Sequence, residues 1–191
     1  EALTTERLDV RWNGMRGQRE DFISVVKKGG LKSNPFPVNI KEVKPVSALF
    51  HRQQHQVCDA AVTLAYKPKS EKELAGIVCY QSESFNYVFG ITKKEKDYYI
   101  VLERTEREGR GPNAKVKSTK LASEKIDVST PVRLQVSAQG DEYRFNYAPE
   151  GGVFKNLGGT VSGDILSTDV AGGFTGALIG LYATSANDIR L

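Results

Sequence analysis

The chain has 191 residues, of which 39% are hydrophobic and 9% aromatic, which is enough for one domain with a sizeable core. Its 27 Lys and Arg residues are interleaved with 23 Asp and Glu residues. This mixing excludes the segregated cationic face of a nucleic-acid-binding protein. No run approaches the ~18 apolar residues of a membrane-spanning helix. From the mixed charges and the absence of such a run, we expect neither nucleic acid nor membrane as a partner.

The first half of the chain alternates short apolar stretches with polar turns. Residues 8–13 predict a strand in which the ring of Trp12 fills the core, and residues 22–26 predict a second strand. Three prolines mark residues 31–47 as an ordered loop or sheet edge. After this loop we expect strand from 48 to 66 and then a polar turn. The next two strands are expected at 75–80 and 85–91.

The second half continues in the same manner. Residues 97–106 and 115–121 predict a charged hairpin, and a tight turn at 139–141 joins the strands expected at 132–137 and 143–147. Residues 154–158 are short and predicted at an edge. Residues 177–184 are apolar on both faces, which predicts a central strand covered on both sides.

No stretch shows a sustained helical period, and neither a repeat nor a linker divides the chain. These observations predict an all-β protein, a two-sheet antiparallel β-sandwich formed by residues 1–191 as a single domain.

Cysteine and histidine suggest no reactive or metal centre. Cys58 and Cys79 lie in different predicted strands, where a disulfide is possible but two buried free thiols are expected. His51 and His55 are four residues apart without a carboxylate or thiol ligand beside them, so we expect an ordinary surface pair.

Acidic residues near strand ends were considered as a hydrolytic pair, because glycoside hydrolysis needs two carboxylates about 5–10 Å apart. The sequence gives no reason for any two of them to converge, so no catalytic centre is expected on this chain. The residues concerned are Glu20, Asp21, Asp59, Glu83 and Asp164.

A glycine-rich loop precedes the last strand. Gly172, Gly173 and Gly176 bracket Phe174, and glycines allow the sharp turns that would hold one ring outward. The pattern alone leaves two placements for Phe174 and favours the one in which its ring covers the core.

Several stretches of the chain resemble one protein family, and they occur in the same order as in that family. The sequence is similar to the C-terminal concanavalin A-like β-sandwich of glycoside hydrolase family 43, in its β-xylosidases and α-L-arabinofuranosidases. The matching stretches are residues 12–13, 19–22, 47–55, 73–78, 86–87, 132–134 and, most specifically, 166–183.

The resemblance implies a catalytic five-bladed β-propeller N-terminal to this sandwich, carrying an Asp base, a Glu acid and a second Asp. None of these residues is expected on this chain, which begins at Glu1 without a leader, so that any signal peptide or upstream domain would be missing from it. The resemblance also implies that the loop acts as a lid on the sugar pocket, with Phe174 projecting. On this basis the pocket rim is assigned to Phe174, Gly173 and Thr175, and contacts with sugar or propeller to Arg52, Gln53, Gln54 and Tyr87.

Two departures from the family pattern concern the C-terminus. The usual last strand is replaced by residues 187–191, so that strand is either shortened or cut off. Some related domains hold a structural Ca²⁺, for which Asp188 is the one matching ligand. No cofactor is otherwise required.

The sequence thus favours a non-catalytic accessory domain of a glycoside hydrolase that acts on xylose- or arabinose-containing oligosaccharides. This domain would pack on the catalytic propeller of the enzyme and shape its substrate pocket. The alternatives are an independent carbohydrate-binding module and a stand-alone hydrolase of the same fold. A homo-oligomer is possible, and the compartment stays open between periplasmic, extracellular and cytoplasmic in a bacterium.

Overall fold

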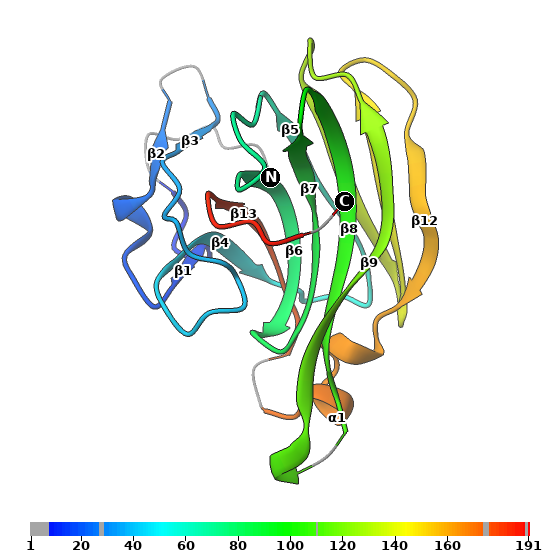
Figure 1. The fold of residues 1–191 in the computed structure, drawn as a ribbon. Helices are drawn as coiled ribbons and strands as arrows, with labels where there is room; N and C mark the ends of the chain where they lie inside the picture. The colour runs from blue at the N-terminus through cyan, green and yellow to red at the C-terminus, as the bar shows by residue number, and fades with distance from the viewer. Residues whose placement is uncertain (1–7, 27–28, 110, 174–175, 190) are drawn as a thin grey trace.

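The structure, a computed structural model, describes residues 8–26, 29–109, 111–173, 176–189 and 191. Two antiparallel sheets lie face to face, and a small two-stranded hairpin stands at one side of them (Figure 1). The predicted all-β sandwich is therefore confirmed.

The larger sheet has seven strands in the order β1-β4-β13-β6-β7-β8-β9. Its strands are β1 (Asn13–Met15), β4 (Val46–Arg52), β13 (Leu178–Thr184), β6 (Leu74–Ser82), β7 (Phe85–Lys94), β8 (Asp97–Glu108) and β9 (Lys115–Ile126). The predicted hairpin of residues 97–121 is confirmed as the β8–β9 pair, which extends toward the end of the sandwich where α1 lies (Figure 1).

The smaller sheet has four strands in the order β12-β11-β10-β5. Its strands are β12 (Lys155–Ser162), β11 (Glu142–Pro149), β10 (Val132–Gln139) and β5 (Val57–Leu64). The separate hairpin pairs β2 (Ile23–Val25) with β3 (Leu31–Ser33). The helices are short: η1 (Arg19–Asp21), η2 (Gly111–Asn113), η3 (Asp164–Leu166) and α1 (Thr168–Ala171). No helix in the described ranges is long and apolar enough to cross a membrane.

Three aromatic rings join the two sheets in the core. Phe145 of β11 is fully buried, and its ring centroid lies 5.6 Å from that of Tyr87 and 5.4 Å from that of Phe89, both on β7. Such offset and edge-on contacts add to the free energy gained from burial. The alternation in β7 works as predicted, because Phe85, Tyr87, Phe89 and Ile91 all face this core.

The opposite face of the larger sheet is also covered. Loop residues such as Ile40 and the C-terminal residues Ile189 and Leu191 pack against Phe50, Tyr80, Val88 and Val101 of the sheet, among others. Strand β13 lies between β4 and β6 and contributes side chains to both faces. The predicted central position is confirmed, but only one face of β13 is largely covered, because Ile179 and Leu181 on the other face are only partly buried.

The predicted strand at residues 8–13 is wrong. The carboxylate of Asp9 accepts a hydrogen bond from the backbone N–H of Arg11, at 2.8 Å, and the Trp12 N–H donates to the Asp9 carbonyl at 3.1 Å. Asp and Asn side chains favour turns of this kind over strand. Val10 is left 85% exposed, and the ring of Trp12 is half-buried and not enclosed by the core.

The continuous strand predicted at 48–66 is divided in two. Strand β4 ends at Arg52 in the larger sheet and β5 begins at Val57 in the smaller one, so residues 53–56 carry the chain across. The polar run Gln53-Gln54-His55-Gln56 interrupts the apolar alternation at this crossing.

Both cysteines carry free thiols, as expected. Burial raises the pKa of Cys79 and, to a smaller extent, that of the half-buried Cys58. Because the thiolate is the reactive form, neither cysteine is set up as a nucleophile.

Candidate functional site

The loop before β13 begins at a capped helical turn. The hydroxyl of Ser167 accepts a hydrogen bond from the Val170 N–H at 3.3 Å, and the Gly172 N–H closes the turn on the Thr168 carbonyl at 2.9 Å. Gly172, Gly173 and Gly176 all have positive φ, between 69° and 77°. Glycine adopts this conformation at little cost, which explains why three of them occur here.

Two glutamine residues anchor this loop at its ends. The buried side chain of Gln81 donates from Nε2 to the Gly172 carbonyl at 2.6 Å. At the other end the backbone N–H of Gln53 donates to the Ala177 carbonyl at 3.1 Å. The loop between these anchors, residues 172–177, is called the glycine loop below.

The side chain of Gln53 is held in turn by the smaller sheet. Its Oε1 accepts a hydrogen bond of 2.6 Å from the hydroxyl of Tyr143, and its Nε2 donates to the His55 carbonyl at 3.1 Å. Gln53 therefore joins both sheets to the base of the glycine loop.

Of the remaining predicted contact residues, two lie exposed beside the glycine loop and one, Tyr87, lies in the core. Arg52 pairs with Leu178 across β4 and β13, and it is exposed beside the loop, as is Gln54. A Cβ built on Gly176 would lie 3.9 Å from the Arg52 guanidinium. Gly173 is exposed within the loop, whereas Phe174 and Thr175 lie outside the described residues, so the pocket-rim assignment stays a prediction.

The structure corrects the predicted contact of Tyr87 with sugar or propeller. Its side chain is fully buried, and its hydroxyl donates to the Ser162 carbonyl at 2.7 Å. Burial raises the pKa of Tyr87 to about 12. It contributes to the core and cannot contact a sugar or another domain.

Three of the five acidic residues considered for hydrolysis have contacts within the sandwich. Asp59 accepts a hydrogen bond of 2.5 Å from Ser137 Oγ, Glu20 accepts one of 2.7 Å from Arg19 Nε, and Glu83 forms an ion pair with Arg16. His51 packs edge-on against Trp12, whereas His55 is exposed. Within the part of the chain that the structure describes, no three His, Cys, Asp or Glu residues are grouped to hold a metal ion.

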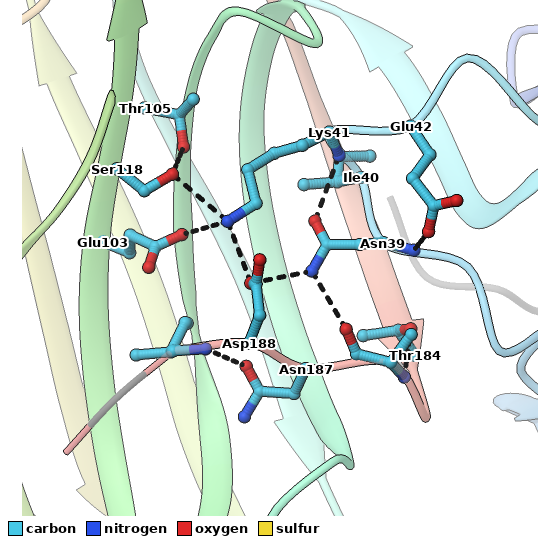
Figure 2. Close-up of polar contacts among 12 residues, drawn as sticks. Asn39, Ile40, Lys41, Glu42, Glu103, Thr105, Ser118, Thr184, Asn187 and Asp188 are labelled. Carbon is cyan, nitrogen blue, oxygen red and sulfur yellow. Dashed lines mark hydrogen bonds and ion pairs between the residues drawn. The ribbon is translucent and has the colours of Figure 1, made fainter. Parts of the chain in front are cut away.

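A second polar cluster lies on the outer face of the larger sheet (Figure 2). The ammonium of Lys41 contacts three oxygens: Asp188 Oδ1 at 2.9 Å, Ser118 Oγ at 3.1 Å and Glu103 Oε1 at 3.3 Å. Asn39 Nδ2 also donates to Asp188, at 3.1 Å. The cluster ties the loop before β4 and the C-terminal segment to β8 and β9.

These contacts bear on the predicted Ca²⁺. An ammonium group of the chain itself already neutralises the carboxylate of Asp188, which leaves a donor set unlike the several free oxygens that calcium needs. The structural Ca²⁺ stays a prediction that the contacts of Asp188 do not favour.

Comparison with known proteins identifies the family. Residues 3–189 match the family model described as the β-xylosidase C-terminal concanavalin A-like domain. The chain belongs to this family. The resemblance of the sequence to glycoside hydrolase family 43 is thereby confirmed.

Similar proteins are much longer than this chain. A family 43 structure from a capybara gut metagenome is 41% identical with a TM-score of 0.86, and the match covers 95% of this chain and 34% of that one. The non-reducing end α-L-arabinofuranosidase BoGH43B of Bacteroides ovatus is 26% identical over 94% of this chain and 32% of that protein. Xylosidase/arabinosidase 43B of Humicola insolens is 27% identical over 71% of this chain and 26% of that protein. The chain thus spans about a third of the length of its relatives, as an accessory domain does.

We predict that Gln81→Leu loosens the glycine loop without unfolding the sandwich. The substitution removes the donor to the Gly172 carbonyl, and a neutral hydrogen bond contributes about 1 kcal/mol. Hydrogen exchange followed by mass spectrometry should then show roughly fivefold faster exchange in peptides covering residues 168–178.

The matched control is Gln135→Leu, which removes the acceptor of a 3.2 Å bond from Asn146 in the smaller sheet. Exchange in the loop peptides should stay at the wild-type rate in this variant. Equal effects of the two substitutions would show that Gln81 does not anchor the loop.

Glu103 gives a prediction about pH. Burial raises its pKa above the ordinary value of 4.5, against the opposing effect of Lys41. A carboxyl with a raised pKa in the folded state stabilises the fold when protonated, and this contribution is lost as pH rises through that pKa. The free energy of unfolding of Glu103→Gln should therefore increase relative to wild type between pH 4.5 and pH 7, measured by urea denaturation.

Lys41→Met is the complementary variant. It leaves the buried Glu103 without its cation, which should cost about 3 kcal/mol at pH 7 and less near pH 4.5, where the carboxyl is protonated more easily. This account of the cluster would be contradicted if, in both variants, the difference from wild type in the free energy of unfolding did not change with pH.

Proposed function

We propose that this chain is the non-catalytic accessory domain of a glycoside hydrolase that acts on xylo- or arabino-configured oligosaccharides. In this proposal it packs on an N-terminal catalytic β-propeller and shapes the propeller's substrate pocket with the glycine loop. The observation that carries the proposal is the family match over residues 3–189, in relatives about three times as long. The names of those relatives, xylosidases and arabinofuranosidases, supply the substrate class.

The anchoring of the glycine loop supports its role as a lid. Hydrogen bonds to Gly172 and Ala177 fix both ends, while the positive-φ glycines let the backbone between them turn sharply. A short loop with fixed ends can hold one side chain at a defined place relative to a neighbouring cavity. In this proposal that side chain is Phe174, which follows Gly173 in the sequence.

The mechanism proposed is positional. An aromatic ring at the mouth of a pocket excludes water and limits the length of substrate that enters, but it transfers no proton. The carboxylates of Asp59, Glu83 and Glu103 are engaged in ion pairs and hydrogen bonds within the sandwich, which supports the proposal that acid–base chemistry comes from the neighbouring domain.

Phe174→Ala in the full-length protein tests the lid. We expect kcat/KM for an aryl xyloside or arabinoside to fall roughly tenfold, equivalent to about 1.4 kcal/mol of lost transition-state stabilisation. Phe154→Ala is the matched control, because this half-buried ring packs on Arg133 of the smaller sheet, away from the loop. Wild-type kinetics in Phe174→Ala, or an equal loss of kcat/KM in the control, would contradict the proposed lid role.

The 191-residue chain alone tests the claim that it has no catalytic centre. It should release no pentose from aryl xylosides or arabinosides above the rate in buffer, under conditions in which the full-length protein turns them over. Measurable turnover by the chain would favour a stand-alone hydrolase of this fold.

A further inference from the structure

A cleft between the two sheets runs from Trp12 along β4 and β13 to residues 52–55, which lie beside the base of the glycine loop. We propose that this cleft binds a neutral saccharide, at a site separate from the pocket that the loop is proposed to shape. Its lining includes Trp12, His51, Gln54, Asp59, Ile77 and Leu181. We call it the Trp12 cleft.

The cleft exists because the two sheets differ in width. Seven strands face four, and β5 is the last strand of the smaller sheet on this side. The inner faces of β13 and β4 therefore extend beyond β5 and leave Ile179 and Leu181 partly exposed. The cavity encloses about 340 Å³, at the lower end of the roughly 300–1,000 Å³ typical of small-molecule sites.

Trp12 is held in place at the rim. The guanidinium of Arg19 donates to the backbone carbonyls of Asp9 and Trp12, both at 2.7 Å, and to that of Leu8 at 3.3 Å. The indole packs edge-on against His51, with ring centroids 5.5 Å apart and planes at 67°. A ring fixed in this way binds a ligand without the cost of ordering a mobile side chain.

The floor and the rim of the Trp12 cleft suit a sugar ring. Ile77, Ile179 and Leu181 form an apolar floor, and the indole offers a flat apolar surface of the kind that packs on the C–H face of a pyranose or furanose. Sugar hydroxyls both donate and accept hydrogen bonds. The exposed amide of Gln54 can do both.

The charges favour a neutral ligand. Among the described lining residues the only Lys or Arg is Arg52 and the only Asp or Glu is Asp59, which is hydrogen-bonded to Ser137, so neither an anion nor a cation meets a surface of uniform opposite sign. A mono- or disaccharide with an apolar face and a hydroxylated edge matches this lining.

The only tryptophan of the chain lies in the proposed site, which gives a direct probe. We expect xylobiose, arabinobiose or cellobiose at millimolar concentrations to shift the fluorescence of Trp12 in a saturable manner, with matching heats in calorimetry. The absence of both signals for all three saccharides would overturn the proposal.

Variants locate the binding. Trp12→Ala should abolish the calorimetric heat, and the exposed substitution Gln54→Ala, which does not threaten the fold, should weaken binding roughly fivefold. Lys96→Ala, in the exposed turn between β7 and β8, should bind as wild type does. Unchanged binding in both cleft variants would place the saccharide elsewhere and overturn the proposal.

The same titration in the full-length protein, followed by calorimetry with a catalytically inactive variant, separates this site from the lid. Binding that Phe174→Ala leaves intact and that both Trp12→Ala and Gln54→Ala weaken supports the Trp12 cleft, whatever the kinetic effect of Phe174. Loss of cleft-dependent binding in the full-length protein would assign the cleft to contact with the neighbouring domain and overturn the proposal.

Discussion

The pairing of β13 on both of its edges is the constraint on which the proposed sites depend. Hydrogen bonds to β4 on one side and to β6 on the other fix its register, Leu178 opposite both Arg52 and Tyr80. This register sets where the glycine loop leaves the sheet and which side chains line the Trp12 cleft. A slip of one residue would exchange the two faces of β13 and remove Ile179 and Leu181 from the cleft floor. The proposed lid and the proposed saccharide site therefore both depend on the position of this one strand.

The sequence predicted the strands whose side chains alternate without interruption, and it failed where a local polar contact competes with strand. Strand β7 and the β10–β11 hairpin follow from simple period-two patterns, and the β7–β8 and β10–β11 registers are regular over the paired residues. At residues 8–12, the Asp9 carboxylate captures a backbone N–H and turns the chain, which apolar spacing does not reveal. At 53–56 the chain changes sheet, and only the run of polar residues marks the crossing.

The candidate site was predicted in part. The family resemblance pointed to the glycine loop and to Arg52 and Gln53 beside it, which the structure places together. Tyr87 was assigned wrongly because an aromatic residue on a strand faces either solvent or core, and the pattern of β7 already placed it with the core set. Gln81 was missed: a glutamine in an otherwise apolar strand is a signal that a buried amide has a partner, here the Gly172 carbonyl. The Trp12 cleft depends on unequal sheet widths, which only the folded structure gives.

The central claim is that this sandwich has no reactive centre and acts by presenting the glycine loop to the pocket of another domain. A crystal structure of the full-length protein with a xyloside or arabinoside bound in its catalytic pocket tests it most directly. The account predicts that the ring of Phe174 lies within van der Waals contact of the bound sugar and that the acid and base residues come from the other domain. A glycine loop facing solvent, remote from the sugar, or two carboxylates of this sandwich flanking the glycosidic bond, would contradict it.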